Sequence, residues 1–208
     1  MSDLRIAVPR GALFSDTLDL LASLGIDTDE VRANDRKLLF EDAGLITMRP
    51  SDVPTYVASG AADLGITGKD VLMEQSDRPV YELLDLGYGR CTMVLATIDG
   101  PDPAAEALRR LGVMRVATKY PRISAQYFED TGRQAEIVEV KGSVELAPLT
   151  GLAEAIVDLT ATGTTLRENG LVVREEIAVA TARLIANPVA HKLRAAAIDD
   201  LVGRIRAR

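Results

Sequence analysis

Several residue types that support particular chemistries are scarce or missing from this chain of 208 residues. It contains no tryptophan, one cysteine, one histidine and 4% aromatic residues. Cys91 has no second cysteine to pair with, and Cys91 and His191 are too few for a cluster with zinc-ligand spacing. The scarcity of aromatic residues argues against stacking platforms for single-stranded nucleic acid. We therefore expect a protein of a reducing compartment, with no metal held by its own side chains.

Excess positive charge and long apolar runs are lacking too. The formal net charge of -7 at pH 7 repels polyanions at long range, which argues against nucleic acid or an anionic membrane as the main partner. No apolar run is long enough to span a membrane, and the N-terminus becomes polar again by Pro9, unlike a signal peptide. A cytoplasmic protein is expected, in which any phosphate-binding site is local.

Short apolar runs alternate with helix signals along the chain. Hydrophobic residues make up 47% of it, which is ample for a core or two. Strands are predicted at 4–8, 64–67, 91–96, 113–118, 135–140, 155–159 and 171–180, and a hairpin within 36–48, while residues 80–86 close the first block. Helices are predicted at 15–24, 51–60, 101–111, 124–130, 144–149 and 189–206, and after residue 68. This order indicates α/β layers with largely parallel sheets.

The sharpest local signal lies at 156–166, where an apolar strand reaches Asp158 and a turn of small and hydroxylated residues opens a helix. Small side chains let backbone N–H groups approach a phosphate, and a helix N-terminus adds partial positive charge. Asp158 is placed to accept hydrogen bonds from ribose hydroxyls. These features favour a sugar phosphate site made by Asp158, Thr160, Ala161, Thr162, Gly163, Thr164 and Thr165.

The alternative for this loop is a threonine-rich connection whose hydroxyls only cap the helix, and the loop in isolation does not separate the two. The residues before it do. The segment 139–166 closely resembles the signature of the ATP phosphoribosyltransferase family, which joins a Gly-Ser-x-Glu element to an Asp-x-x-x-Thr-Gly-x-Thr loop. This chain has the first element at 142–145 and the second at 158–165.

The resemblance extends over essentially the whole chain. Further blocks that are similar to the family lie at 36–38, 49–57, 60–70, 117–120 and 184–187. One block departs, because the family often has Lys-Gly-Arg after its first strand where this chain has Arg10-Gly11-Ala12. A cation is kept at position 10, whereas Ala12 stands where the family usually has an arginine.

The resemblance implies a two-lobed α/β fold like that of type II periplasmic ligand-binding proteins, with the active site in the cleft between the lobes. Residues 1–87 and 171–208 would form the nucleotide-side lobe. Residues 88–170 would form the lobe that binds phosphoribosyl pyrophosphate.

The family reaction implied is attack of adenine N1 of ATP on C1 of phosphoribosyl pyrophosphate, the first step of histidine biosynthesis. Pyrophosphate leaves, so the site needs cations and a substrate-bound Mg²⁺ more than a strong base. The resemblance assigns Arg36 and Arg49, with Arg10, to ATP phosphate or leaving pyrophosphate. It assigns the loop at 158–165 to the ribose 5-phosphate, with Glu145 orienting the donor. The nucleotide-side wall would comprise Arg10, Gly11, Asp63, Thr67, Gly68 and Asp70.

Chain length adds an expectation about partners. Family members have a long form with a C-terminal regulatory domain and a short form without it, and this chain ends at Arg208, after the last predicted helix. The short form resembles enzymes that work with a histidyl-tRNA-synthetase-like regulatory subunit. We therefore expect a homodimer inside a hetero-oligomer, with His191 and Cys91 outside the mechanism.

Two other functions are compatible with parts of this pattern. One is a solute-binding or sensing module of the same architecture, which the complete loop at 158–165 argues against. The other is a phosphoribosyltransferase that salvages a free base. Such enzymes usually show two adjacent acidic residues before the loop, and here Asp158 stands alone.

Overall fold

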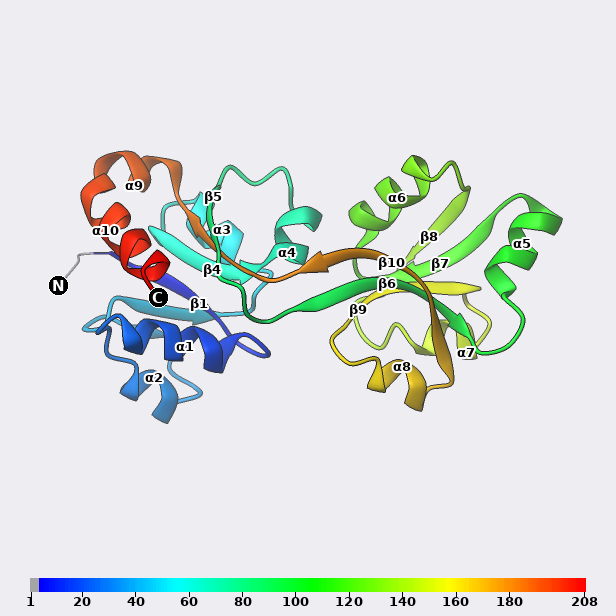
Figure 1. Ribbon diagram of the computed structural model, residues 1–208, viewed down its shortest axis with the longest axis horizontal. Helices are drawn as coiled ribbons and strands as arrows, with labels where there is room; N and C mark the ends of the chain where they lie inside the picture. The colour runs from blue at the N-terminus through cyan, green and yellow to red at the C-terminus, as the bar shows by residue number, and fades with distance from the viewer. Residues whose placement is uncertain (1–3) are drawn as a thin grey trace. The chain divides into compact units, whose positions relative to one another are not determined.

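The computed structural model describes residues 4–208, which pack as two compact units (Figure 1). The first unit contains residues 4–89 and 181–208, and the second contains Arg90–Ala180. Each unit is built on one β-sheet with helices packed against it. The chain therefore passes from one unit to the other twice, after Gly89 and after Ala180.

Six strands form the sheet of the first unit, in the order β2-β3-β1-β4-β11-β5. They are β1 (Ile6–Pro9), β2 (Leu39–Phe40), β3 (Leu45–Met48), β4 (Leu64–Gly68), β5 (Tyr81–Asp85) and β11 (Ala182–Ala186). β1 is parallel to β3 and β4, whereas β2, β11 and β5 run antiparallel to their neighbours. The carboxyl ends of β1, β3 and β4 therefore meet at one edge of the sheet.

Two clusters of buried side chains hold the helices of this unit on its sheet. The helices are α1 (Phe14–Ser23), α2 (Asp29–Ala33), α3 (Val53–Ala58), α4 (Lys69–Glu74), α9 (Pro188–Leu193) and α10 (Ala195–Arg206). Leu18 of α1 and Ile198 of α10 belong to one cluster with Val8 of β1. Val53 of α3 belongs to the other, with Ala7 of β1. Because Ala7 and Val8 point to opposite faces, β1 is buried on both, which is why it reads as a continuous apolar run.

A glycine in β4 determines how closely α3 lies against the sheet. A Cβ on Gly65 would be 2.5 Å from Cγ1 of Val53 and 2.7 Å from Cγ2 of Val57, which is too close for real atoms. The helix therefore packs directly on the β4 backbone. This contact fixes the start of α3, and with it the turn that precedes the helix.

The sequence predicts one terminal helix over 189–206, and this prediction is wrong because the structure has two. α9 starts after Asn187, whose Oδ1 accepts hydrogen bonds from the N–H groups of Val189 and Ala190 at 2.9 and 2.8 Å. It ends at Leu193, because the φ of -121° and ψ of 30° of the next residue, Arg194, leave the helical region. The sequence shows no glycine or proline near Arg194, so its pattern gives no sign of the break.

The sheet of the second unit has the order β10-β6-β9-β7-β8. Its strands are β6 (Cys91–Ile98), β7 (Met114–Thr118), β8 (Ala135–Glu139), β9 (Ala155–Thr160) and β10 (Leu171–Ala180). Its helices are α5 (Pro103–Leu111), α6 (Pro121–Asp130), α7 (Leu146–Leu149) and α8 (Thr164–Glu168). β7 is parallel to β8 and β9, and β6 runs antiparallel to β9 and β10.

Both sheets are mixed, which corrects the expectation of largely parallel sheets. The chain leaves the first unit after β5 and returns to it as β11, so these two neighbouring strands run in opposite directions. For the same reason β6, which enters the second unit, is antiparallel to β10, which leaves it. Because β10 pairs along its length with β6, its ten residues belong to the second unit. The boundary after this unit therefore lies at Ala180 rather than at Gly170.

Candidate active site

Charged and hydroxylated residues follow the carboxyl ends of the parallel strands in the second sheet. Lys119 comes directly after β7, and Asp158 lies in the last half of β9. The register pairs Thr118 of β7 with Val157 of β9, which brings the next residues of both strands side by side. Lys119 Nζ lies 3.7 Å from Asp158 Oδ1.

The carboxylate of Asp158 is largely enclosed. Its side chain is 14% exposed, and Oδ1 accepts a hydrogen bond from the N–H of Leu159 at 2.8 Å. Burial raises the pKa of Asp158 above its usual range, the charge of Lys119 opposes this shift, and the charge of Glu145 adds to it. Glu145 is the N-cap residue of α7 and is half-buried.

The loop after Asp158 is shaped by its own side chains. Gly163 has a left-handed backbone (φ 71°), and its N–H donates to Thr160 Oγ1 at 2.7 Å. The hydroxyls of Thr162 and Thr164 are 2.9 Å apart, and Arg167 donates to Thr162 O at 2.9 Å and to Thr164 Oγ1 at 3.1 Å. The N-cap of α8 has no side-chain hydrogen bond. The hydroxyls of Thr160 and Thr162 accept the N–H groups of Gly163 and Thr164 at 2.7 and 3.4 Å, so they take part in capping this helix start. An anion at this N-terminus would satisfy its further N–H groups.

The corresponding edge of the first sheet collects most of the residues expected to contact the nucleotide. Arg10 and Gly11 follow β1, Arg49 follows β3, and Gly68 ends β4. A Cβ on Gly68 would lie 2.0 Å from Oδ1 of Asp70, so this carboxylate folds back over the Gly68 backbone. These residues come from three parallel strands and share one edge for that reason.

Arg10 uses its guanidinium on its own unit. Its Nε donates to Thr47 Oγ1 at 3.0 Å, its Nη2 donates to the carbonyl of Lys37 at 2.9 Å, and its Nη1 is 3.8 Å from Asp35 Oδ1. Arg10 thus ties the loop around Arg36 to β3. The side-chain oxygen of Asn34 accepts the N–H groups of Arg36 and Lys37 at 3.1 and 3.0 Å, which adds a second hold on this loop.

Arg36 and Arg49 differ from Arg10 because their side chains are not used in the fold. Both residues are exposed. Within residues 4–208, neither guanidinium has a hydrogen bond or an ion pair. Two cations are therefore presented on rigid backbone next to the carboxyl edge of the first sheet.

Asp63 lies at the opposite edge of that sheet, which corrects its placement with Thr67 and Gly68. It precedes β4, whereas Thr67 and Gly68 end it, and four residues of strand separate positions by about 13 Å. Its Oδ2 accepts the N–H of Arg5 at 2.8 Å and pairs with Arg194 at 3.1 Å. Asp63 therefore joins β4 to β1 and to the junction of the two terminal helices.

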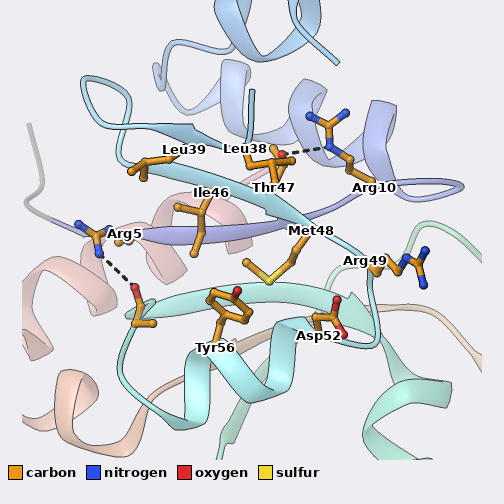
Figure 2. Close-up of a pocket in the computed structure, with 11 residues that line it drawn as sticks. Arg5, Arg10, Leu38, Leu39, Ile46, Thr47, Met48, Arg49, Asp52 and Tyr56 are labelled. Carbon is orange, nitrogen blue, oxygen red and sulfur yellow. Dashed lines mark hydrogen bonds between the residues drawn. The ribbon is translucent and has the colours of Figure 1, made fainter. Parts of the chain in front are cut away.

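A pocket of about 540 Å³ runs along the side of the β2–β3 hairpin in the first unit (Figure 2). Its floor is apolar and its rim is charged. The lining residues are Arg5, Arg10, Leu38, Leu39, Ile46, Thr47, Met48, Arg49, Asp52, Tyr56 and Ala61. The pocket reaches the carboxyl edge of the sheet at Arg10 and Arg49.

Comparison with known proteins decides the family. A family model described as HisG: ATP phosphoribosyltransferase matches residues 49–207. The ATP phosphoribosyltransferase of Rubrobacter xylanophilus is 53% identical over 99% of this chain and 96% of its own, and that of Bacillus licheniformis is 45% identical over 98% and 94%. This chain belongs to the ATP phosphoribosyltransferase family. It transfers the phosphoribosyl group of phosphoribosyl pyrophosphate to ATP, which makes it a pentosyltransferase of histidine biosynthesis.

Solved structures agree with this assignment. A chain of the HisG:HisZ ATP phosphoribosyl transferase complex from Thermotoga maritima is 32% identical, with a TM-score of 0.79, over 97% of this chain and 98% of that one. The periplasmic aliphatic sulphonate binding protein SsuA of Escherichia coli, at 12% identity, matches with a TM-score of 0.61 over 98% of this chain and 72% of that one. The expected resemblance to periplasmic binding proteins is confirmed at the level of the fold.

One candidate residue of this phosphoribosyltransferase escaped the sequence reasoning. Lys119 lies in a block similar to the family, yet nothing in the sequence separates it from a surface lysine. Only the pairing of β7 with β9 brings it to Asp158. The available signal was its position directly after a buried strand, because cleft residues of α/β proteins gather there.

Among residues 4–208, no three His, Cys, Asp or Glu side chains gather as a metal site would require. None of the helices in the same range has the length and apolar character needed to cross a membrane.

Proposed function

We propose that the loop at 158–165 binds the 5-phosphate end of phosphoribosyl pyrophosphate. The observation that carries this proposal is the enclosed Asp158 carboxylate beside Lys119, at the mouth of a turn that Gly163 opens toward a helix N-terminus. Thr160 to Thr165 supply N–H and hydroxyl groups for the phosphate, and Asp158 accepts from the ribose hydroxyls. Glu145, close enough to affect the pKa of Asp158, orients the donor.

Lys119 has a second effect in this proposal. A buried carboxylate is a good acceptor for ribose hydroxyls only while it is ionised, and burial favours its neutral form. The ammonium group 3.7 Å away opposes this effect and favours the ionised carboxylate. Lys119 thereby maintains the acceptor and adds positive charge beside the phosphates.

Arg36 and Arg49 are proposed to bind ATP phosphate or the leaving pyrophosphate. These roles are supported by the exposure of both residues and by the absence of a hydrogen bond or ion pair on either guanidinium within residues 4–208. Arg10 and Thr67 act through the backbone they hold, and Gly11, Gly68 and Asp70 form the nucleotide-side wall. Asp63 is left out, because its contacts place it at the other edge of the sheet.

This arrangement suits the charge changes of the reaction. As adenine N1 attacks C1, the sugar carbon becomes cationic and negative charge grows on the departing pyrophosphate. Preplaced arginines stabilise that growing charge without reorganising at the moment of transfer. No strong base is needed, since the attacking nitrogen uses its own lone pair.

Mg²⁺ is proposed to bind through the substrate phosphates. The ion, when bound, neutralises part of the diphosphate charge. Mg²⁺ commonly uses one or two carboxylates together with phosphates and water. Asp158, with Lys119 beside it, is the enclosed carboxylate of the proposed donor site.

The catalytic chain is proposed to be the short form, a homodimer that works in a hetero-oligomer with a histidyl-tRNA-synthetase-like regulatory subunit. The HisG:HisZ complex of Thermotoga maritima, whose HisG chain covers the length of this one, supports this arrangement. The single cysteine supports a reducing, cytoplasmic setting.

Pyrophosphate release with three separate acceptors tests the proposal. With phosphoribosyl pyrophosphate and Mg²⁺, we expect turnover with ATP and none with adenine or orotate, and the same preference in the presence of the regulatory subunit. Lys119→Met should raise the KM for the donor without changing the preferred acceptor, whereas Lys192→Met, on α9, should change neither. An unchanged donor KM in Lys119→Met would contradict the proposed donor site.

A further inference from the structure

The turn between β3 and α3, residues 49–52, presents Arg49, and each of its first three carbonyl groups has a donor. The carbonyl of Arg49 accepts the N–H of Asp52 at 2.9 Å, within the turn itself. That of Pro50 accepts the hydroxyl of Thr67 at 2.8 Å. That of Ser51 accepts Nε2 of Gln75 at 2.8 Å. Figure 2 shows Arg49 and Asp52 at the two ends of this turn.

The two side-chain donors come from elements distant in sequence, so they hold the turn against the rest of the unit. Thr67 lies in β4 and is fully buried. Gln75 follows α4, and its Oε1 is buried with no hydrogen-bond partner among the described residues. Burying an amide oxygen without a hydrogen-bond donor costs free energy of folding. We attribute the position of the Gln75 side chain to the hydrogen bond that its Nε2 donates. That donor holds Ser51.

We infer that Thr67 and Gln75 are positioning residues that fix Arg49 for the transfer reaction. This inference rests on the proposed role of Arg49 at the substrate phosphates. No hydrogen bond or ion pair holds the Arg49 guanidinium within residues 4–208, so the turn is what sets the position from which this side chain starts. Thr67, expected from the family resemblance to contact the nucleotide, points its hydroxyl into the protein instead.

A small displacement of the Arg49 guanidinium should have a large effect on the rate of transfer. A guanidinium that stabilises growing charge must already be in place when the charge develops. A shift of about 1 Å in a positioning group can lower the rate by about a hundredfold. Loss of either side-chain hydrogen bond to the turn should therefore lower the rate of transfer, while substrate binding and the fold are kept.

The test compares Thr67→Val, which keeps the shape but removes the hydroxyl, with Thr67→Ser, which restores it. We expect Thr67→Val to lower kcat/KM by about 10- to 100-fold and to change the same kinetic constant that Arg49→Ala changes. Thr67→Ser should recover most of the activity. Gln75→Met, which removes the Ser51 bond and the unpaired oxygen together, should also lower activity without lowering the melting temperature.

Thr17→Val is the matched control. Thr17 is equally buried in the same unit, and its hydroxyl lies 2.8 Å from the hydroxyl of Tyr88, away from the turn. We expect Thr17→Val and Thr67→Val to lower the melting temperature similarly, by about 2–4 °C. Only Thr67→Val should lower activity.

Combination with Arg49→Ala separates this inference from the function on which it rests. If Thr67 acts through Arg49, Thr67→Val should cost little further activity in the Arg49→Ala background. Equal losses in both backgrounds, or full activity of folded Thr67→Val and Gln75→Met, would overturn the inference. Full activity of Arg49→Ala alone would instead overturn the proposed role of Arg49.

Discussion

Lys119 Nζ lies 3.7 Å from Asp158 Oδ1, and this pair joins the ends of two neighbouring parallel strands. The carboxylate is the more buried member, with 14% of its side chain exposed against 43% for the lysine. Burial therefore outweighs the lysine and raises the pKa of Asp158. The fold accepts this unfavourable charge where we propose that the sugar of the donor binds.

Asp158→Asn should separate stability from binding. A carboxyl group whose pKa is raised by folding costs stability at neutral pH, and the cost disappears as pH falls through that pKa. The variant should therefore melt at a higher temperature than the parent at pH 7.5, and the gain should shrink toward pH 4. Donor affinity should fall about 10- to 100-fold, as expected for lost hydrogen bonds to a charged group.

Thermal melts between pH 4 and pH 8, with calorimetric titration of phosphoribosyl pyrophosphate, check both parts. Asp130→Asn, at the exposed end of α6, serves as the control and should change neither property. A pH-independent change in melting temperature for Asp158→Asn would contradict the account of its environment.

Gly163→Ala should damage the phosphate loop more than its backbone strain explains. A side chain at φ 71° costs about 1–2 kcal/mol, and its Cβ would lie 2.8 Å from Arg167 Nη1, which must move away from Thr162 and Thr164. Gly112→Ala is the control, because Gly112 has φ 74° and open space around it. Both variants should lose unfolding free energy in urea, Gly163→Ala somewhat more because of Arg167, and only Gly163→Ala should raise the donor KM.

Arg36→Ala and Arg49→Ala should each weaken transition-state stabilisation by about 2–4 kcal/mol, roughly 30- to 1000-fold in kcat/KM. Neither guanidinium has a hydrogen bond or an ion pair within residues 4–208, so melting temperatures should stay close to the parent value. Arg110→Ala, which removes an arginine with 72% exposure from α5, should leave the rate unchanged. Steady-state assays of pyrophosphate release provide the comparison, and a rate loss in Arg110→Ala as large as the other two would argue against a local role.

Asp63→Ala should affect stability and spare catalysis. The change leaves the N–H of Arg5 and the guanidinium of Arg194 without this acceptor, which should cost about 1–3 kcal/mol of unfolding free energy. The KM for ATP should not change, because Asp63 lies at the edge of the sheet away from Arg49. Chemical denaturation measures the loss of stability, and steady-state kinetics measure the KM for ATP. A raised KM for ATP would instead favour a place for Asp63 in the nucleotide-side wall.

The sequence predicted the parts of the molecule that local chemistry determines. Asp158 and the small residues after it predicted a strand, turn and helix, and these appear as β9, the Gly163 turn and α8. The directions of β10 and β11 could not be predicted, because they depend on where the chain crosses between units.

The positions of side chains within the candidate site also depend on how the strands pack. The chemical type of Thr67 suits a nucleotide contact, yet packing of β4 turns its hydroxyl toward Pro50. Asp63 and Thr67 are close in sequence, yet a strand carries them to opposite edges of the sheet. Lys119 and Asp158 are distant in sequence and become neighbours only through strand pairing.

The most direct measurement is a crystal structure of the protein with phosphoribosyl pyrophosphate bound. The account predicts that 5-phosphate oxygens lie within about 2.7–3.2 Å of N–H or hydroxyl groups of Thr160 to Thr165, with a ribose hydroxyl donating to Asp158. A donor bound elsewhere, with the loop at 158–165 free of phosphate, would contradict it.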